Sequence, residues 1–431
     1  MCFPAGRPCL KSSEQLAVAV DLGTTTIAAS LVERVSGRRL AMTGGLNPQR
    51  EWGADVVTRL AAAQASPDEL AGMKRAVNDS LERFTQELLA LAGVTAAELL
   101  AIVIAGNPTM EHLLLGLPVQ SLAAPPYRPL FFAGKSLNTT ELGWKMSAEA
   151  FVFPLPGGFV GGDLVAFLYG VDVPGPDLAG PRLFLDLGTN GEVALAAGGK
   201  IYATSAAAGP AFEGGNLACG MAALPGAING VTVTGDRVRI TTIGDRPPVG
   251  ICGSAVIAAI AGLLSAGVLD PTGRLLFAEE VPSNLANNIS EVAGVPAFLF
   301  YRDASHAVYL TQEDIRQVQL AKGAVRAGIE VLLARGGVTA ESLAAVVLTG
   351  SFSAALRLES LKSIGVLTES MVKNARFVGD GALSGVIRFA VTTDGAARVE
   401  ELARSLKIIP MSGTPSFERF FMEHIGFYGR D

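Results

Sequence analysis

Two short segments each place an acidic residue at the end of an apolar run, followed at once by glycine and threonine. The first is Asp21-Leu22-Gly23-Thr24-Thr25-Thr26, and the second is Asp186-Leu187-Gly188-Thr189-Asn190-Gly191. Small residues let backbone N–H groups approach a phosphate, and a carboxylate can hold Mg²⁺ through water. Each segment could be a phosphate loop with a magnesium-binding acid, Asp21 or Asp186. Taken singly, each could equally be an ordinary hairpin turn.

The two loops belong to an internal repeat. Each continues as strand, turn and strand, with the turns at Arg34–Arg38 and Ala197–Lys200. Farther along, residues 88–106 match residues 332–350, and both read as a helix end, a threonine-capped turn and a buried strand ending in glycine. The sequence therefore predicts a duplicated domain with a nucleotide between its halves. The second half carries an insertion near 205–310.

Length and charge narrow the class of protein. A chain of 431 residues is long enough for two domains with full cores. The net charge of −6 without a basic run argues against a nucleic-acid surface. The uncharged stretch Ile251–Leu269 contains glycine and serine and lacks a basic flank, so we expect a buried helix between the two domain cores and no membrane span. Without a secretory signal, we expect a cytoplasmic protein.

Several further residues could act in such a site. Asp163 lies in the first turn of a glycine-started helix at 159–170, where it could complement the helix dipole, orient water or lie in the hydration shell of Mg²⁺. His112 starts a leucine-rich helix and is more readily structural than catalytic. Lys322 and Arg326 share one helix face and could contact adenosine or be solvated. A second small-residue helix begins near 377–385 and would let two helices cross closely.

These motifs together resemble the acetate and sugar kinase, heat-shock chaperone and actin superfamily. In that resemblance the two acidic hairpins are the phosphate loops, and Leu348-Thr349-Gly350-Ser351-Phe352 is the adenosine loop. Four other segments look like one branch, the ATP-dependent reductive activators of corrinoid methyl-transfer proteins: Asn47-Pro48-Gln49, residues 53–57, residues 209–216 and residues 314–323.

The resemblance implies an α/β fold of two duplicated ribonuclease-H-like domains, the actin-like ATPase fold, around a nucleotide cleft. Residues 1–15 would be a flexible lead, 16–175 the first domain, 176–392 the second and 393–431 a helical tail. It implies ATP or ADP with Mg²⁺, a water-orienting Asp163, and a corrinoid protein as partner. The residues implied to bind adenosine are Gly350, Ser351, Phe352, Lys322, Gly214 and Gly215.

The cysteines depart from the pattern of that branch, in which many members carry an iron–sulfur domain. Cys2, Cys9, Cys219 and Cys252 lack cluster spacing, so we expect no iron–sulfur cluster in this chain and a separate low-potential electron donor. A homodimer is one assembly that the sequence allows. Two alternatives stay open. One is a small-molecule kinase for a sugar or carboxylic acid, and the other is an electron-gating activator of a dehydratase. For the latter, Ala206-Ala207-Ala208 replaces the expected cluster cysteine.

Overall fold

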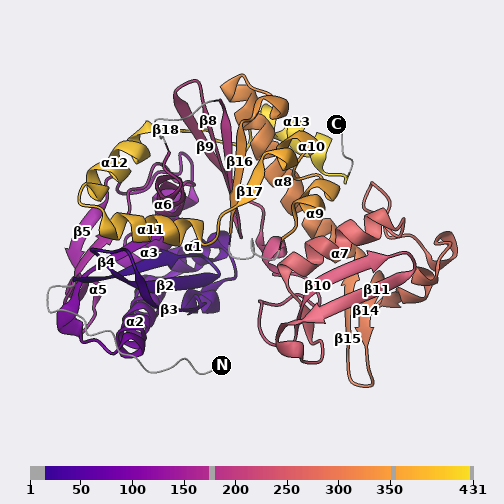
Figure 1. Cartoon of the computed structure of the whole chain (residues 1–431), viewed down its shortest axis with the longest axis horizontal. Helices are drawn as coiled ribbons and strands as arrows, with labels where there is room; N and C mark the ends of the chain where they lie inside the picture. The colour runs from indigo at the N-terminus through magenta and orange to yellow at the C-terminus, as the bar shows by residue number, and fades with distance from the viewer. Residues whose placement is uncertain (1–14, 174–179, 351–355, 428–431) are drawn as a thin grey trace. The chain divides into compact units, whose positions relative to one another are not determined.

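The computed structural model describes residues 15–173, 180–350 and 356–427 (Figure 1). They form two compact units. Unit 1 contains the chain up to Val173 and again Ala382–Arg404, and unit 2 contains the intervening chain and the part from Ser405 onward. The expected tail at 393–431 is therefore divided: its first helix belongs to unit 1, and its remaining strand and helix belong to unit 2.

Unit 1 is built on a six-stranded mixed sheet in the order β3-β2-β1-β4-β6-β5. β1 pairs antiparallel with β2 and parallel with β4, which leaves β1 buried on both faces in the middle of the sheet. This burial explains its nearly continuous apolar sequence. The strands are β1 (Leu16–Leu22), β2 (Thr26–Glu33), β3 (Arg39–Leu46), β4 (Leu99–Gly106), β5 (Lys135–Asn138) and β6 (Glu149–Val152).

The helices of unit 1 cover this sheet, and α2 supplies the largest apolar face. Met73, Val77, Leu81, Phe84 and Leu88 are buried at helical spacing, as the sequence predicts. The α-helices are α1 (Val56–Ala65), α2 (Pro67–Ala92), α3 (Pro108–Leu115), α4 (Gln120–Ala123), α5 (Thr139–Leu142), α6 (Gly162–Gly170), α11 (Gly381–Val391) and α12 (Gly395–Ser405). The short 3-10 helices are η1 (Pro48–Trp52) and η2 (Ala96–Glu98).

Unit 2 repeats the same arrangement. Its main sheet has the order β17-β16-β7-β8-β9-β18, in which β7 again pairs antiparallel with the next strand and parallel with the strand after the long helix. The duplication predicted from the two hairpins is therefore present in the topology. The strands of this sheet are β7 (Arg182–Leu187), β8 (Gly191–Ala197), β9 (Lys200–Ala206), β16 (Ala345–Thr349), β17 (Ala375–Phe377) and β18 (Leu406–Ile408).

The second repeat is equally clear at the ends of the two long helices. α2 ends at Gly93 and α8 (Gln312–Gly336) ends at Gly337, and both glycines are left-handed, with φ of 68° and 65°. Each is followed by one 3-10 turn, η2 or η7 (Ala340–Ser342), behind Thr95 or Thr339. A left-handed glycine ends a helix because only glycine adopts this conformation without steric cost.

The insertion of unit 2 adds two three-stranded sheets and a helix between β9 and α8. The first sheet has the order β11-β10-β12 and the second β13-β14-β15. The elements are η3 (Pro210–Glu213), β10 (Ala227–Thr234), β11 (Arg237–Thr242), η4 (Ile243–Asp245), β12 (Gly250–Ile251), α7 (Gly253–Ser265), η5 (Ala278–Glu280), η6 (Asn284–Asn288), β13 (Ile289–Val292), β14 (Val295–Arg302) and β15 (Ala307–Thr311).

The uncharged stretch Ile251–Leu269 forms α7, and α7 is buried as predicted. Its predicted place between two domain cores is wrong: α7 packs against β10 and α9 in the core of unit 2, because the insertion supplies its own apolar sheet. Among the described residues no helix has the length and apolar character that crossing a bilayer requires. The remaining helices of unit 2 are α9 (Leu358–Ser363), α10 (Glu369–Lys373) and α13 (Pro415–His424).

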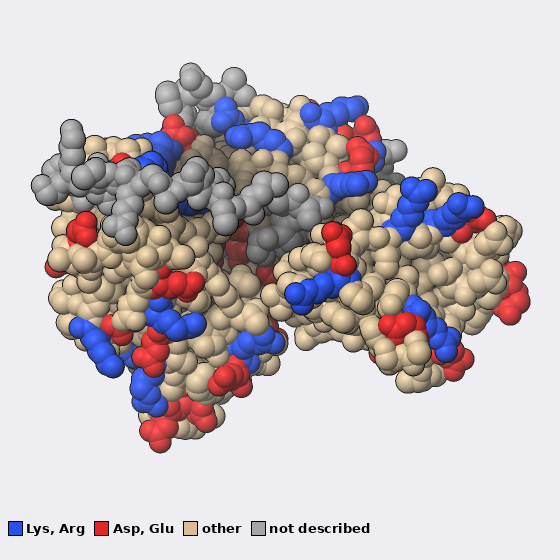
Figure 2. Space-filling view, turned by 60° about the horizontal axis from the view of Figure 1, so that its bottom comes forward, with Lys and Arg blue, Asp and Glu red and all other residues tan. Residues whose placement is uncertain are grey.

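The crossing of α6 and α11 in unit 1 is unusually close. A Cβ atom on Gly385 would lie 1.7 Å from the backbone oxygen of Ala166. Beside it, Arg388 donates to the backbone oxygen of Tyr169 at 2.7 Å and forms an ion pair with Asp172. The prediction that small residues let these two helices approach closely is therefore confirmed. On the face shown in Figure 2, acidic and basic side chains are interspersed.

Candidate functional site

Asn47 supports the first acidic hairpin through hydrogen bonds to its backbone. The Asn47 side chain donates to the backbone oxygen of Gly23 at 2.9 Å, and its backbone N–H donates to the oxygen of Thr25 at 2.9 Å. A Cβ atom on Gly23 would lie 2.5 Å from the oxygen of Thr26, so this turn accepts only glycine. Because a peptide is planar and trans, the Thr24 N–H points away from Asn47. The loop thus presents a backbone donor on the side opposite its support.

The end of β4 lies beside this loop. Leu22 is in register with Gly106, and Asp21 with Ala105. Asn107 caps α3 and donates from its side chain to the Thr24 hydroxyl at 2.9 Å. Asn107 lies in the loop between β4 and α3. Within unit 1, the contact with Thr24 brings this loop to the first acidic hairpin.

Asp163 also reaches this end of the sheet. A Cβ atom on Gly161 would lie 2.6 Å from the oxygen of Gly106 and 2.7 Å from Asp163 Oδ1, so the start of α6 packs tightly on the end of β4. Asp163 accepts a hydrogen bond from the Leu164 N–H at 2.8 Å, as expected of an acid in a first turn. Burial raises the pKa of Asp163 to about 6. Unit 1 therefore assembles Asp21, the Gly23–Thr26 turn and Asp163 at one edge.

A buried arginine lies behind the same edge. Arg59 on α1 is fully buried, donates from Nε to the oxygen of Gly53 at 2.9 Å, and contacts Met110 Sδ at 3.3 Å through Nη1. Asn47 also donates to this sulfur, at 3.4 Å. Burial lowers the pKa of Arg59 to about 10. α1 is thereby tied through Met110 to the residue that supports the first loop.

The second acidic hairpin is braced by the glutamate of the glycine-rich segment after β9. Thr189 donates its hydroxyl proton to the carboxylate of Glu213, and the Gly188 N–H donates to the oxygen of Asn190 at 3.1 Å. A Cβ atom on Gly191 would lie 2.6 Å from a methyl group of Val325 on α8. Asp186 is directly opposite Glu192 on β8, whose carboxylate accepts from Ser205 at 3.0 Å.

The glycine-rich segment is fixed by close backbone contacts. Gly214 has a φ of 82°, and Asn216 is also left-handed, at 57°. A Cβ atom on Gly215 would lie 2.5 Å from the Pro210 side chain, and one on Gly253 would lie 1.7 Å from the oxygen of Phe212. η3 therefore packs directly on the start of α7. Because Glu213 bonds to Thr189, Gly214 and Gly215 lie next to the second loop, as their predicted nucleotide contact requires.

The start of the predicted adenosine loop lies beside the same hairpin. Thr349 is in register with Asp186, and a Cβ atom on Gly350, with φ of 134°, would lie 2.2 Å from the oxygen of Leu187. The Thr349 hydroxyl accepts from the Gly381 N–H at 2.8 Å. Ser351 and Phe352 lie outside the described residues.

Lys322 on α8 is covered by a C-terminal segment of the chain. Its ammonium group donates to the backbone oxygen of Gly426 and lies 5.5 Å from the centre of the Phe427 ring. Burial, and secondarily the charge of Arg326, lowers the pKa of Lys322 to about 7. Of the two alternatives for Lys322 and Arg326, a solvated face is wrong, because both are buried where α13 and the segment after it cover this face of α8. An adenosine contact by Lys322 remains a prediction.

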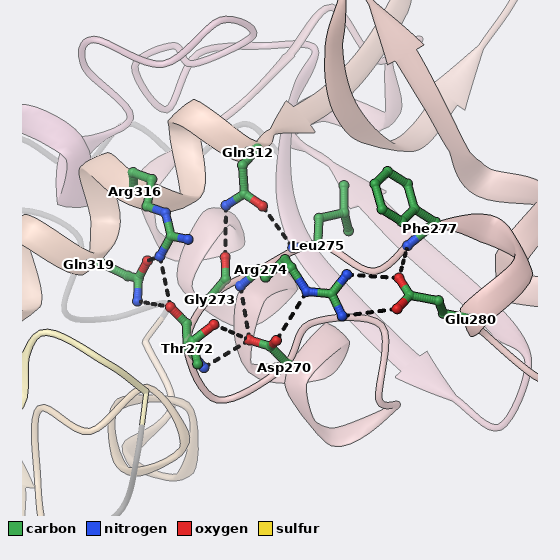
Figure 3. Close-up of polar contacts among 10 residues, drawn as sticks. All are labelled: Asp270, Thr272, Gly273, Arg274, Leu275, Phe277, Glu280, Gln312, Arg316 and Gln319. Atoms are coloured by element: carbon green, nitrogen blue, oxygen red, sulfur yellow. Dashed lines mark hydrogen bonds and ion pairs between the residues drawn. The ribbon is translucent and has the colours of Figure 1, made fainter.

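The segment that covers Lys322 is anchored by the loop that precedes η5 (Figure 3). Gln312, Arg316 and Gln319 project from one face of α8 and hold the backbone oxygens of Gly273 and Thr272. Gln319 also donates to the oxygen of Ile425 at 3.2 Å, and the Phe427 N–H donates to Pro271 at 2.8 Å. Other contacts drawn in this view include those of Arg274 with Asp270 and Glu280, of Gln312 with Leu275, and of Glu280 with Phe277.

Lys322→Met is expected to remove a pH dependence of stability. The pKa of Lys322 is about 7 in the folded chain against an ordinary 10.5, so between these values only the unfolded chain binds the proton. Stability from this residue therefore rises with pH over that range, by at most about 5 kcal/mol. Chemical denaturation at neutral and at alkaline pH measures it. The exposed Lys407 supplies the control K407M, and an unchanged slope in K322M would contradict the burial argument.

His112 and the described cysteines have structural environments. His112 is fully buried, its Nδ1 lies 2.7 Å from the Pro108 oxygen, and its Nε2 accepts from the Leu130 N–H at 3.0 Å. Both ring nitrogens are thus engaged by backbone. Cys252 is buried and Cys219 is partly buried, and burial raises the pKa of the Cys219 thiol. Cys2 and Cys9 lie outside the described residues.

The structure thus brings most predicted site residues together at one edge of each sheet. It also adds three side chains that sequence reasoning did not single out. Glu111 is fully buried beside Asp163, Arg59 lies behind the first loop, and Asn107 holds Thr24. Asn107 could have been recognised as a helix cap before Pro108. Glu111 and Arg59 have no fixed spacing from the acidic hairpins, so no signal in the sequence marks them.

Comparison with known proteins agrees with this geometry. A model of the RACo middle region matches residues 16–174, and a model of the C-terminal domain of RACo, the ASKHA domain, matches residues 180–431. A solved structure of a reductive activator for a corrinoid, iron–sulfur protein superposes with a TM-score of 0.87 and 29% identity. The match covers 98% of this chain and 67% of that one.

Two curated relatives are also similar. A corrinoid activation enzyme of Eubacterium limosum, RamQ, is 29% identical over 94% of this chain and 69% of its own length. A Co(II) methylated amine-specific corrinoid protein reductase of Methanosarcina barkeri is 26% identical over 58% of this chain and 46% of its own length. The model of the ASKHA domain alone matches more than half of the residues of this chain. The chain therefore belongs to the RACo family and has the duplicated fold of the ASKHA domain.

Proposed function

We propose that the chain binds and hydrolyses Mg-ATP in order to activate a corrinoid protein, in which inactive cobalt(II) is reduced to cobalt(I). The electron comes from a separate low-potential donor. The observation that carries the proposal is the superposition of nearly the whole chain on a reductive activator, with both acidic hairpins in matching places of the repeat. The two curated relatives, named for the same kind of reaction, support it.

The residues of the two hairpins fit a nucleoside triphosphate. Gly23 and Gly188 each begin a turn of small residues at a strand end, and supports behind the turns fix their backbones. Such turns bind phosphate oxygens through N–H groups. Asp21 and Asp186 would hold Mg²⁺ through water, and the ion would neutralise charge on the phosphates. Gly214, Gly215 and the loop from Gly350 would border the adenosine.

Hydrolysis would use Asp163 as the water-orienting residue. A water molecule donates a hydrogen bond to the Asp163 carboxylate, and its oxygen attacks the terminal phosphorus atom. The bond from that phosphorus to the bridging oxygen breaks, ADP leaves with the electron pair, and the proton of the water passes to Asp163 and then to solvent. Asn107 and Asn47 keep the first loop in place during this step.

Two observations weigh against the alternative functions. Ala206-Ala207-Ala208 stands where related electron-gating activators place a cluster cysteine, and Cys219 has a raised pKa because it is buried. A small-molecule kinase would use the same loops, but a structural match that covers 98% of this chain with a TM-score of 0.87 is to a reductive activator for a corrinoid, iron–sulfur protein. Neither alternative accounts for the four segments shared with that branch.

The proposal is tested by following cobalt(I) formation spectroscopically in a cobalt(II) corrinoid protein with an external low-potential reductant. We expect formation only when the chain and Mg-ATP are both present, with ADP released. Stimulation of ADP release by a sugar or a short carboxylic acid, with a phosphorylated product, would instead establish a kinase.

A further inference from the structure

Two carboxyl groups of unit 1 lie against the same pair of glycines. A Cβ atom on Gly161 would lie 2.7 Å from Asp163 Oδ1, and one on Gly162 would lie 2.5 Å from Glu111 Oε1. Glu111 comes from α3 and Asp163 from α6, and the charge of Asp163 raises the pKa of Glu111. The two glycines therefore lie between the fully buried Glu111 and the partly buried Asp163.

The two acids have different hydrogen-bond environments. Asp163 lies in the first turn of α6, where it accepts from the N–H groups of Leu164 and of Asp163 itself and benefits from the helix dipole. Glu111 accepts one bond, from the Gly106 N–H at 3.0 Å, into Oε1. Its Oε2 is buried and has no hydrogen-bond partner among the described residues. Backbone donors stabilise the charged form of a carboxyl group, so Asp163 is the better anion.

Among the residues that the structure describes, no lysine, arginine or histidine forms an ion pair with Glu111. Its neighbours in sequence are Met110, an apolar side chain, and His112, whose ring nitrogens contact backbone and whose pKa is lowered by burial and by Lys135. Asp21, at the end of the neighbouring strand β1, adds a further acid to this edge of the sheet. Burial and the charge of Asp163 both raise the pKa of Glu111 well above its ordinary value.

We propose that Glu111 is a positioning residue that carries a proton at neutral pH, so that Asp163 stays ionised and can orient the attacking water. The role of Glu111 in orienting water rests on the proposed hydrolysis. The location of the proton does not, because it can be measured without any activity. Environments that separate the proton affinities of two adjacent acids fix which one acts as acid and which as base. Here Glu111 is the neutral acid of the two, and its unpaired Oε2 is the atom that carries the proton.

Infrared spectroscopy of the folded protein at neutral pH locates this proton. A protonated carboxyl group gives a carbonyl band distinct from that of a carboxylate, and isotope-labelled glutamate should shift the band whereas isotope-labelled aspartate should not. The band should disappear in Glu111→Gln and persist in Asp163→Asn. Glu82 supplies a matched control, because it is also a buried glutamate of unit 1 and accepts from the N–H groups of Lys145 and Met146 at 2.8 and 2.9 Å. Glu82→Gln should leave the band in place.

The pH profile of hydrolysis gives the second readout. Glu111→Gln replaces a neutral acid with a neutral amide of the same shape, so we expect kcat within about twofold of the parent and the same acid limb. If Glu111 were ionised in the parent, its loss would move that limb to lower pH by about one unit or more. Glu111→Leu, which leaves Gly106 without its acceptor, should lower kcat about 10-fold or more while nucleotide affinity is kept.

The two readouts separate the possible failures. A band that responds to labelled aspartate, or that survives Glu111→Gln, overturns the assignment of the proton whether or not the protein hydrolyses ATP. A parent protein that shows the glutamate band but no ATP hydrolysis keeps the assignment and counts against the proposed function. If Glu111→Gln fails to fold, the labelled parent and Asp163→Asn still decide the question.

Discussion

Replacing Asp186 with asparagine is expected to abolish the thermal stabilisation that Mg-ATP gives to the protein. Asp186 ends β7 beside Thr349 and opposite Glu192, at the edge where Gly188 and Gly350 also lie. At a nucleotide concentration about 100-fold above Kd, binding should stabilise the parent by about 2.7 kcal/mol, equivalent to a shift of about 3 °C for 431 residues that unfold together. Without the carboxylate, Mg²⁺ loses a partner and the shift should vanish in a thermal melt.

The apo protein should be little affected, since Asp186 lies at a strand end and outside the apolar core. Asp236, in the exposed turn between β10 and β11 of the same unit, supplies the control Asp236→Asn, which removes the same charge without touching the hairpin. Asp21→Asn should reproduce the loss seen in Asp186→Asn. Retention of the full shift in either acidic-hairpin variant would mean that one loop suffices, against the inference from the duplication.

The duplication could be predicted because short sequence patterns, each formed by neighbouring residues, indicate it. An apolar strand ending in Asp-Leu-Gly-Thr dictates a hairpin whichever domain it belongs to, and Gly93 and Gly337 end their helices through their own left-handed backbones. These features depend on neighbours in sequence, so matching them revealed the succession of strands and helix that the two halves share. Asp163 was recognisable for the same reason, since an acid in a helix's first turn is a local pattern.

Features that depend on distant parts of the chain could not be predicted. Lys322 looks like a surface lysine on α8 until α13 and Phe427 cover it, and these lie about a hundred positions later. Glu111 looks like an ordinary acid of a short helix, and only the packing of Gly161 and Gly162 shows that it is buried close to Asp163. The return of α11 and α12 to unit 1 likewise requires the contact of Gly385 with Ala166.

The predicted site residues are therefore of two kinds. Residues of the turns, such as Gly23 and Gly191, are fixed by backbone geometry, and a side chain there would clash at 2.5 or 2.6 Å. Charged residues, such as Asp163 and Lys322, are defined by burial, which changes how readily each binds a proton. The first kind is visible in composition and spacing. The second kind needs the three-dimensional structure, because burial is a property of the packed chain.

Replacing Asp163 with asparagine is expected to slow hydrolysis while making the folded protein more stable. Loss of a general base typically lowers kcat about 10²- to 10⁴-fold, and nucleotide affinity should be unchanged. The pKa of Asp163 is raised from 3.8 to about 6, so the folded chain binds the extra proton between these values and its stability falls as pH rises through them. At neutral pH the buried charge costs roughly 3 kcal/mol at most, and asparagine removes that cost.

Asp172 gives the opposite case: its pKa is lowered, mainly by the hydrogen bond from Arg388, so Asp172→Asn should weaken the fold slightly and leave kcat unchanged. Chemical denaturation and single-turnover hydrolysis measure both variants. An Asp163→Asn protein that is less stable than the parent, or that hydrolyses ATP at the parental rate, would remove Asp163 from the site.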